Sequence, residues 1–423
     1  MDSIKITPSV LSGKVKVPPS KSFAHRAVLA AFLSDGECKI NNIRLSEDIS
    51  ATLNCIKALG AEFEYDNKKS SVLISRKAAI PCGKIRLDCG ESGSTLRFLI
   101  TIALCFSQNL EFTGRGRLME RPMKPVFDIF DEKKIKYSLK NGVLSVKGKL
   151  SAGDFKIDGS ISSQFITGLL FALPLLDGDS RIIIEETLTS KGYIDITLDV
   201  LKKFGIKIEN DNYKVFTIKG NQQYKAKNYT VEGDFSQAAF FLTAGALGCD
   251  ITCTGLKENS LQGDKKILDI ISQTGAKIEK VSANGFKAIS TANMHGITVD
   301  ADEIPDLVPI LAVLLAFCKG ESRIVNAARL RIKESDRLAA TCSELKALGA
   351  DITEGDDLLI INGVQVLSGN TVSSHNDHRI AMATAIAACR CEGDVIIDGA
   401  KKSVKKSYPD FFDDYKKLGG ITE

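Results

Sequence analysis

Six strongly apolar segments recur along the chain, and each begins with polar or charged residues. Successive segments begin roughly 70 residues apart, and this even spacing indicates an internal repeat. A segment that is apolar on every side predicts a helix buried in protein. The segments begin at Lys21-Ser22, Ser94-Thr95, Ser162-Ser163-Gln164, Phe235-Ser236-Gln237, Asp306-Leu307 and Asp377-His378-Arg379. Because the first N–H groups of a helix lack internal partners, polar clusters at these starts predict places that can hold an anion.

The predicted elements follow one order in each repeat: a strand, the polar cluster with its apolar helix, a second strand, an amphipathic helix and a closing pair of strands. In the fifth repeat, for example, the amphipathic pattern covers residues 338–349 and the last closing strand covers 358–361. Five of the six amphipathic segments end at a Gly, which is typical of a left-handed helix cap. The sequence therefore predicts an α/β protein of βαβαββ-type units with buried helices and outer sheets.

The sixth repeat is incomplete, because only residues 420–423 follow its amphipathic helix. The N-terminal segment has a spare strand at 3–7, ahead of the strand at 13–17 that we assign to the first repeat. We expect strand 3–7 to complete the sixth repeat. Three repeats per lobe then place the first lobe at 14–226 and the second lobe at 1–13 with 227–423. A plain solenoid of six units is the alternative, but it needs no distinct polar cluster in each unit.

The composition is that of an ordinary water-soluble globular protein, with 44% hydrophobic and 26% charged residues in 423. A net charge of +4 argues against nucleic-acid binding driven by overall charge. The longest apolar runs are too short to span a bilayer, and the N-terminus shows no signal peptide. Eleven cysteines without a C-x-x-C pair predict reduced thiols, and hence a cytoplasmic protein.

The strongest local signal for chemistry is the run from Arg329 to Leu338, which contains four cations and two carboxylates. Charged runs usually form a solvated helix face. Here Lys333 and Arg337 are expected to lie one helical turn apart on a shared face. Cations at a helix N-terminus oppose the helix dipole and therefore need an anionic partner. The run predicts an anion-binding site.

Three further segments offer contacts to an anion. Lys21, Ser22 and Arg26 stand at a predicted helix start, where an Arg can bind a carboxylate with two hydrogen bonds. The alternative is a Ser-capped helix with a surface Arg. The segment 158–164 carries hydroxyl and amide donors suited to phosphate or sugar oxygens, or it caps its helix. The glycines of segment 89–97 would let the backbone approach a ligand, but this signal alone is weak.

Asp306 opens a buried helix, so it is either a helix cap or a carboxylate held among cations as an acid–base group. His375 and His378 have an H-x-x-H spacing that could suggest a metal. We expect no metal there, because the sequence shows no matching third ligand.

These motifs, in their order along nearly the whole chain, resemble those of the 5-enolpyruvylshikimate-3-phosphate (EPSP) synthase family of 3-phosphoshikimate 1-carboxyvinyltransferases. The combination of segment 333–338 with Asn376-Asp377-His378-Arg379 is highly specific for the family. The resemblance implies the two-lobed enolpyruvyl transferase fold with three repeated units in each lobe. It also implies transfer of the enolpyruvyl group of phosphoenolpyruvate to the 5-hydroxyl of shikimate 3-phosphate, with release of phosphate, in a cleft between the lobes. That reaction belongs to the shikimate pathway of aromatic amino acid and chorismate biosynthesis.

The resemblance also implies the roles of individual residues. The residues implied for shikimate 3-phosphate are Lys21, Ser22, Arg26, Ser162, Ser163, Gln164, Ser190, Tyr193, Asp306 and Lys333. Those implied for phosphoenolpyruvate are Lys21, Gly93, Arg121, Gln164, Arg337, Arg379 and Lys406, and those for catalysis are Asp306, Glu334 and Lys21. The family implies inhibition by glyphosate and a monomeric enzyme. It implies no cofactor, no metal, and no nucleic-acid or membrane partner.

Some positions depart from the family pattern. Glu91 stands where many members carry Asn, and Arg329 stands where a neutral amide often meets the substrate, so both are left out of the site. Of two adjacent lysines we choose Lys406, because it directly precedes Ser407-Tyr408-Pro409.

Two other functions remain open. The related UDP-N-acetylglucosamine enolpyruvyl transferases usually carry a Cys on a loop, but the matching segment 113–122 has none. A non-catalytic anion-binding protein would keep the arginines and need neither Asp306 nor Glu334.

Overall fold

The computed structural model describes residues 2–76 and 83–423 and divides the chain into two compact units. The first unit spans residues 21–231, and the second unit combines the residues up to 20 with residues 232–423. Each division lies a few residues after the lobe boundary expected at 13–14 or at 226–227. The N-terminal segment thus belongs to the same unit as the C-terminal half of the chain.

Within the described residues the strands form six four-stranded sheets and one two-stranded sheet. In a complete repeat such as the second, the sheet order is β6-β7-β9-β8, with a parallel first pair and antiparallel pairs after it. The third and fifth repeats have the same order. The strands of these repeats are β6 (Ile85–Asp88), β7 (Asn109–Thr113), β8 (Lys136–Lys140), β9 (Val143–Lys147), β10 (Gly153–Ile157), β11 (Ser180–Ile184), β12 (Ile208–Asp211), β13 (Val215–Ile218), β18 (Thr298–Asp300), β19 (Glu321–Val325), β20 (Asp351–Glu354) and β21 (Leu359–Asn362).

The first and fourth repeats take their first strand from a distant part of the chain. Strand β2 (Ser12–Lys16) pairs in parallel with β15 (Asp250–Thr254) of the fourth repeat, so our assignment of strand 13–17 to the first repeat was wrong. The first repeat instead receives β14 (Tyr229–Thr230), which pairs in parallel with β3 (Cys38–Asn41). The sequence of such a short strand does not show which strand it pairs with. The alternation of polar and apolar residues indicates only which face of the strand is buried. The remaining strands of the two sheets are β4 (Glu62–Asp66), β5 (Ser71–Ser75), β16 (Lys277–Ser282) and β17 (Gly285–Ile289).

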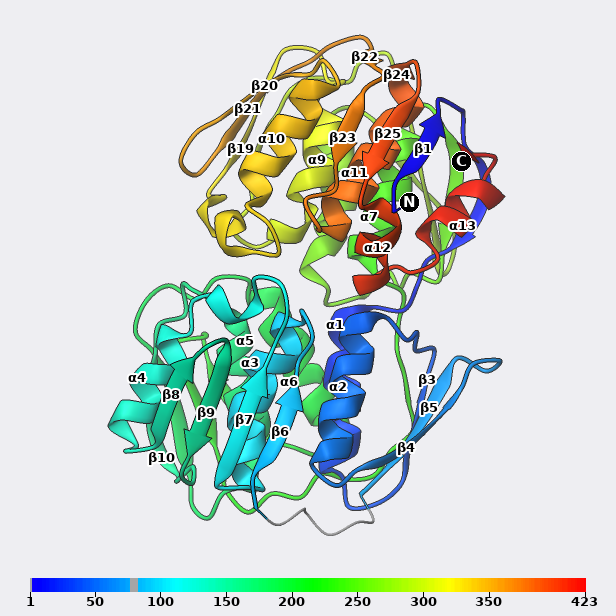
Figure 1. The fold of residues 1–423 in the computed structure, drawn as a ribbon. Coiled ribbons are helices and arrows are strands. Elements are labelled where there is room, and N and C mark those ends of the chain that lie inside the picture. Colours follow the sequence, from blue (N-terminus) through cyan, green and yellow to red (C-terminus); the bar gives the residue numbers. More distant parts are fainter. Residues whose placement is uncertain (1, 77–82) are drawn as a thin grey trace. The chain divides into compact units, whose positions relative to one another are not determined.

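The N-terminal strand completes the sixth repeat, as predicted. Strand β1 (Ile4–Thr7) lies between β25 (Val395–Asp398) and β26 (Ile421–Thr422) and is antiparallel to both. Figure 1 shows β1 beside β25. The sheet order is β23-β25-β1-β26, and β23 covers Thr371–Ser373. The two-stranded sheet joins β22 (Leu367–Ser368) to β24 (Cys391–Glu392).

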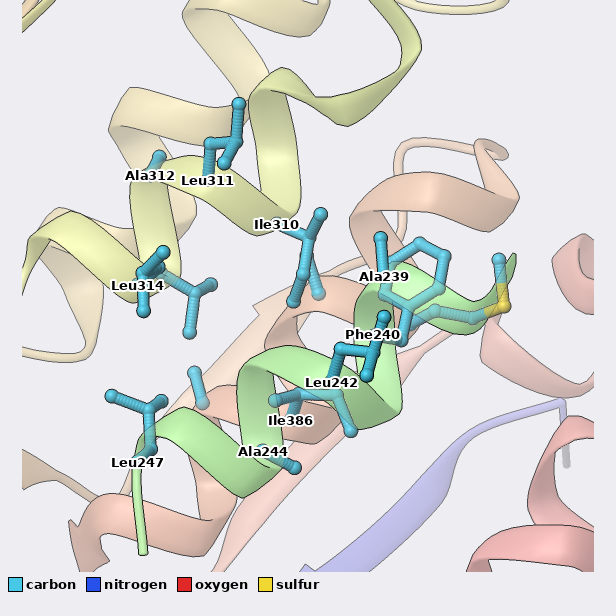
Figure 2. Close-up of a cluster of buried hydrophobic side chains, with 14 of the residues drawn as sticks. Ala239, Phe240, Leu242, Ala244, Leu247, Ile310, Leu311, Ala312, Leu314 and Ile386 are labelled. Atoms are coloured by element: carbon cyan, nitrogen blue, oxygen red, sulfur yellow. The ribbon is translucent and has the colours of Figure 1, made fainter. Parts of the chain in front are cut away.

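The six apolar helices begin where the polar clusters predict, apart from a 3₁₀ turn that separates Asp306 from its helix. In the second unit, α7, α9 and α11 contact one another, and every residue of α7 and α9 is buried. Figure 2 shows Leu242 of α7, Ile310 of α9 and Ile386 of α11 pointing into this shared core. These helices are α1 (Lys21–Leu33), α3 (Gly93–Ile102), α5 (Ser163–Ala172), α7 (Phe235–Ala246), α9 (Val308–Leu315) and α11 (His378–Ala387).

The amphipathic helices are also present, but one begins later than predicted. Helix α10 starts at Arg337, because the side chain of Asp336 caps it by accepting a hydrogen bond from the Ala339 amide at 3.1 Å. Lys333 therefore lies before the helix and does not share a helical face with Arg337, contrary to our prediction. The remaining α-helices are α2 (Glu47–Ala58), α4 (Lys124–Glu132), α6 (Lys191–Lys203), α8 (Ile267–Gln273), α10 (Arg337–Ala347), α12 (Ala400–Ser403) and α13 (Phe411–Lys417).

Short 3₁₀ turns follow or precede several helices. They are η1 (Ala103–Cys105), η2 (Leu118–Glu120), η3 (Leu173–Leu175), η4 (Gly263–Lys266), η5 (Pro305–Leu307), η6 (Ala328–Ile332), η7 (Ala388–Arg390) and η8 (Val404–Lys406). In the part of the chain that the structure describes, no helix has the length and apolar character needed to cross a membrane.

Candidate functional site

In the second unit, Asp306 is the centre of a cluster of cations. Its Oδ1 accepts a hydrogen bond from Arg337 Nη1 at 2.8 Å, and its Oδ2 accepts one from Arg379 Nη2 at 2.8 Å. Arg379 also donates to the Asp306 backbone carbonyl at 2.9 Å, and Lys333 Nζ lies 3.8 Å from Oδ1. The starts of three helices, α9, α10 and α11, thus bring these side chains together.

Arg337 holds three carboxylates at once. Besides Asp306, it donates to Glu334 Oε2 at 2.7 Å and to Asp377 Oδ2 at 2.7 Å, and its side chain is only 2% exposed. The two carboxylates predicted as an acid–base pair are therefore bound by one guanidinium. Such charge-assisted hydrogen bonds fix both carboxylates in place.

The charges of this cluster shift the protonation of Asp306 and Lys333. Burial would raise the pKa of Asp306, but the charges of Arg379, Lys333 and Arg337 hold that pKa well below its usual range. Asp306 is therefore ionised at neutral pH. Burial lowers the pKa of Lys333 to about 8, although Asp306 opposes the shift.

The loop before α11 is anchored to Lys406. The Lys406 ammonium is buried and donates to the backbone carbonyl of Asn376 at 2.6 Å. His375 and Asn376 both have left-handed backbone angles, with φ of 49° and 54°. Asp377 follows them and caps α11 by accepting from the Arg379 amide at 2.9 Å. Sequence reasoning left Asp377 out of the site, although its position before the helix was a signal for a cap.

The histidines of the H-x-x-H spacing have different surroundings. His375 Nε2 lies 2.6 Å from Glu344 Oε1, whereas His378 is buried in the first turn of α11. In residues 2–76 and 83–423, no group of three or more His, Cys, Asp or Glu is placed to hold a metal ion.

In the first unit, Arg26 is a buried cation surrounded by neutral oxygen atoms. It is 3% exposed and donates to Thr197 Oγ1 at 2.8 Å and to the carbonyls of Ser22 and Tyr193 at 2.8 and 3.1 Å. Its guanidinium also lies 5.1 Å from the ring centroid of Phe98. Burial lowers the pKa of Arg26 to about 10, still far above neutrality. A cation in such a setting can bind an anion without first breaking an ion pair.

The start of α5 is joined to α3 by a polar network. Arg97 Nη1 donates to Gln164 Oε1 at 2.9 Å and to Ser162 Oγ at 3.4 Å, and Gln164 Nε2 donates to Ser94 Oγ at 3.0 Å. Arg97 was not among the predicted site residues, although it stands one helical turn after Gly93 in segment 89–97. The network fixes the amide of Gln164, one of the predicted ligands.

Gly93 leaves room for an arginine. A Cβ atom at this position would lie 2.9 Å from Arg121 Nη1 and 3.6 Å from Gln164 Oε1. Three residues predicted for phosphoenolpyruvate therefore lie close together at the start of α3. The absence of a side chain at Gly93 is what permits the guanidinium to lie there.

The other predicted ligands of this unit stand at helix starts. Lys21 Nζ donates to Asp48 Oδ2 at 2.8 Å, a partner that sequence reasoning missed. Ser162 caps α5 by accepting from the Gln164 amide, and Ser163 is the first residue of that helix. Ser190 precedes α6 in a left-handed conformation with φ of 55°. Non-glycine residues held in this conformation cluster at functional sites.

The two positions that depart from the family pattern also have polar surroundings. Arg329 Nη2 lies 3.2 Å from Asp302 Oδ1. The carboxylate of Glu91 lies beside Gly116, where a Cβ atom would be 2.8 Å from Glu91 Oε2.

The predicted site residues thus form two groups, one in each unit. The first unit holds Lys21, Ser22, Arg26, Gly93, Arg121, Ser162, Ser163, Gln164, Ser190 and Tyr193. The second unit holds Asp306, Lys333, Glu334, Arg337, Arg379 and Lys406.

Comparison with known proteins gives one consistent family. The family model described as EPSP synthase (3-phosphoshikimate 1-carboxyvinyltransferase) matches residues 6–415. A 3-phosphoshikimate 1-carboxyvinyltransferase of Clostridium perfringens (strain 13 / Type A) is 52% identical over 424 residues, covering 100% of this chain and 99% of that protein. The corresponding protein of Clostridium acetobutylicum is also 52% identical over 424 residues, covering 99% of this chain and 98% of that protein.

Solved structures agree with this family. The EPSP synthase of Acinetobacter baumannii is similar with a TM-score of 0.80 and 25% identity, covering 100% of this chain and 99% of that chain. The enolpyruvyl transferase NikO of Streptomyces tendae has a TM-score of 0.82 at 17% identity, over 100% of this chain and 98% of that one. Together they confirm the predicted enolpyruvyl transferase fold.

Proposed function

This chain belongs to the EPSP synthase (3-phosphoshikimate 1-carboxyvinyltransferase) family, and we propose that its two groups of polar residues are the substrate ligands of that activity. The enzyme transfers the enolpyruvyl group of phosphoenolpyruvate to the 5-hydroxyl of shikimate 3-phosphate and releases phosphate. The observation that carries the proposal is the Asp306 cluster. It holds an ionised carboxylate among three cations, with Glu334 bound to one of the same cations.

The reaction requires two proton transfers in the addition and one in the elimination. In the addition, the 5-hydroxyl oxygen bonds to C2 of phosphoenolpyruvate, C3 gains a proton, and the hydroxyl loses one. In the elimination, the bond from C2 to the phosphate oxygen breaks and C3 loses a proton. Asp306 is ionised and is proposed as the base that takes the hydroxyl proton, because a carboxylate can act in this role only when it is unprotonated. Glu334 then serves the proton transfers at C3, and Lys21 stabilises charge on the phosphate.

The first-unit residues suit shikimate 3-phosphate. The carboxylate of shikimate 3-phosphate is proposed to bind Arg26, a buried cation that has only neutral partners in the described contacts. The hydroxyls of Ser162, Ser163 and Ser190 suit the 3-phosphate, because two of them stand at the start of α5, where backbone N–H groups favour an anion. Gln164 and Tyr193 are proposed to contact the ring, and Asp306 and Lys333 are proposed as further ligands of the same substrate.

Phosphoenolpyruvate is proposed to take the cations and the amide that the family pattern implies. Arg379 and Lys406 are buried cations at the start of α11 and in η8. Arg121 lies beside Gly93 in the first unit. Lys21, Gln164 and Arg337 complete this set. Because both substrates carry several negative charges, cations must neutralise them before they can approach each other.

The family membership also suggests an inhibitor, an oligomeric state and a cellular location. We propose that glyphosate competes at the phosphoenolpyruvate ligands, that the enzyme acts as a monomer, and that it is cytoplasmic. The cysteines of the described residues are all free thiols, which supports a reducing compartment.

The test of the proposed function is phosphate release from phosphoenolpyruvate with each of two acceptors. Shikimate 3-phosphate should support release, and UDP-N-acetylglucosamine should not. Product masses identify which acceptor received the enolpyruvyl group. Turnover with the UDP-sugar alone would reverse the assignment, and no release with either acceptor would favour a binding protein.

A further inference from the structure

Asp264 is a buried carboxylic acid that the mechanism above does not use. It lies in η4 and is 4% exposed. Its Oδ2 accepts a hydrogen bond from the hydroxyl of Ser236, in the first turn of α7. Its Oδ1 is buried and has no hydrogen-bond partner among the described residues. An ionised carboxylate would leave strong acceptor sites unsatisfied there, so the geometry favours the protonated acid.

The turn that carries Asp264 is held in place on two sides. The Gln262 side chain donates to one backbone carbonyl and accepts from one backbone amide near the start of α7, at 2.8 and 3.0 Å. On the other side, a Cβ atom at Gly263 would lie 3.3 Å from the carbonyl oxygen of Glu303, in the segment that leads to Asp306. Asp264 is therefore fixed near the Asp306 cluster.

The charged groups around Asp264 come from four elements. Burial and the charge of Asp306 raise the pKa of Asp264 to about 7, and Asp234 before α7 acts in the same direction. Arg379 of α11 opposes them, as does the hydrogen bond from Ser236. On the same turn, Lys266 is exposed, and Lys265 donates to the backbone carbonyl of Glu258.

We propose that Asp264 is a positioning residue for this activity, and that its carboxyl group must be protonated for an anionic substrate to bind at the Asp306–Arg379 pair. The inference rests on the assignment of Arg379 to phosphoenolpyruvate in the proposed function. An ionised Asp264 adds a second negative charge near Asp306, attracts Arg379 and repels the substrate. Because the two equilibria are linked, anion binding and protonation of Asp264 favour each other.

The test compares the wild type with Asp264→Asn, which is permanently neutral and has the shape of the protonated acid. The dissociation constant of phosphoenolpyruvate is measured at about pH 6 and about pH 8 by equilibrium dialysis without shikimate 3-phosphate, so that no turnover consumes the ligand. The ratio of the dissociation constant at pH 8 to that at pH 6 should be roughly five- to tenfold larger in the wild type than in Asp264→Asn, since a linked shift of one pKa unit changes a binding constant tenfold. The ionisations of the substrate phosphate and of Lys333 affect both proteins and cancel in this ratio. Equal pH 8 to pH 6 ratios in the wild type and Asp264→Asn would overturn the inference.

Two further measurements keep the inference testable if Asp264→Asn binds poorly. Ser236→Ala removes a donor that favours the ionised acid, so the rise in the dissociation constant should move to higher pH, and an unmoved midpoint would count against the role.

Thermal unfolding gives a readout independent of binding. A carboxyl pKa raised in the fold penalises the folded state increasingly between about pH 4 and pH 7. Asp264→Asn should therefore gain melting temperature over the wild type across that range, and a pH-independent difference would overturn protonation.

Asp269→Asn, at an exposed carboxylate of α8, is the matched control and should reproduce the wild type in every measurement. The outcomes for the two proposals remain distinct. A wild type that releases no phosphate would refute the proposed function, whereas normal turnover with equal ratios would refute only the role of Asp264.

Discussion

Arg26 illustrates how a single residue can be kept for binding at the expense of stability. It is a buried cation whose hydrogen bonds go to Thr197, to Thr167 and to the carbonyls of Ser22 and Tyr193. None of these partners carries a formal charge. The fold therefore bears part of the cost of desolvating the guanidinium, and a bound carboxylate would offset it.

Replacing Arg26 by Met should separate binding from stability. We expect the dissociation constant of shikimate 3-phosphate to rise about 10²-fold, because a charge-assisted pair is lost. We expect the free energy of unfolding to change by only about 1 kcal/mol, since the lost hydrogen bonds and the relieved desolvation oppose each other. Isothermal titration and urea unfolding measure the two effects. A large loss of stability with unchanged affinity would make Arg26 a structural residue.

Asp306 should behave in the opposite way, through turnover. In Asp306→Asn we expect kcat to fall roughly 10²- to 10⁴-fold, because the proton acceptor is lost, while the KM values change much less. Asp302→Asn, at a carboxylate that pairs with Arg329, is the control and should keep wild-type turnover. Unchanged turnover in Asp306→Asn would remove this residue from the mechanism.

The depressed pKa of Asp306 also has a consequence for stability. The ion pairs of Asp306 with Arg337 and Arg379 stabilise the fold at neutral pH. A carboxylate with a lowered folded pKa loses this stabilisation only as pH falls below its unfolded value of about 4. The stability difference between wild type and Asp306→Asn should thus be constant from about pH 8 to pH 5 and shrink in acid. A difference that shrinks already near pH 6 would contradict the low pKa.

The sequence could identify most of the charged residues but not their partners. Asp306, Arg337 and Arg379 were recognisable, because each stands at the start of a helix in a specific motif. That Arg337 binds Glu334, Asp306 and Asp377 together was not predictable, because three separate helix starts supply these groups. Asp48 and Arg97 escaped notice for the same reason: each acts on a group from another segment.

At the scale of elements, the close packing of α3 against α5 depends on one glycine. A Cβ atom on Gly168 would lie 2.7 Å from Thr101 Oγ1 and 2.8 Å from the carbonyl oxygen of Arg97. The backbone oxygen cannot move without moving α3 itself. The pairing of these helices also places Arg97 against Gln164, so the packing and the site are connected.

Gly168→Ala should therefore force the two helices apart. We expect the free energy of unfolding to fall by about 2 kcal/mol, despite the better helix propensity of Ala. Gly36→Ala is the matched control, because its Cβ atom would meet only the side chain of Ala226, at 3.1 Å. Chemical denaturation measures both variants, and equal stabilities would show that α3 and α5 tolerate a wider separation.

The elements themselves were largely predictable from periodicity, and two of the errors have a clear cause. Helix α10 starts at Arg337 because the Asp336 side chain caps it there, a local competition that the charge pattern did not reveal. Strands β2 and β14 join sheets of repeats distant in sequence. Periodicity gives the face of a strand but not its neighbour.

At the scale of the whole molecule, the N-terminal strand belongs to the fold of the C-terminal half. Strand β1 is an inner strand of the sheet β23-β25-β1-β26. Residues Ile4 and Ile6 are buried in the core of the second unit. Because β1 pairs with both β25 and β26, its loss would leave each of these strands without its partner on that side.

Removing residues 2–7 should selectively destabilise the second unit. We expect hydrogen exchange to accelerate in β25 and α11 while the strands of the first unit keep their protection, because the deleted contacts lie within one unit. Replacing Val10, which is exposed, by Ser is the control. Uniform loss of protection in both units would contradict the division of the chain.

The central claim is that the cations singled out from the sequence are the ligands of phosphoenolpyruvate. Its most direct test is the dissociation constant of phosphoenolpyruvate, measured by equilibrium dialysis without shikimate 3-phosphate so that no turnover consumes the ligand, for the wild type, Arg121→Met and Arg379→Met. We predict at least about tenfold weaker binding in each variant, since each loses a charge-assisted contact to the same anion. Wild-type affinity in either variant would contradict the account.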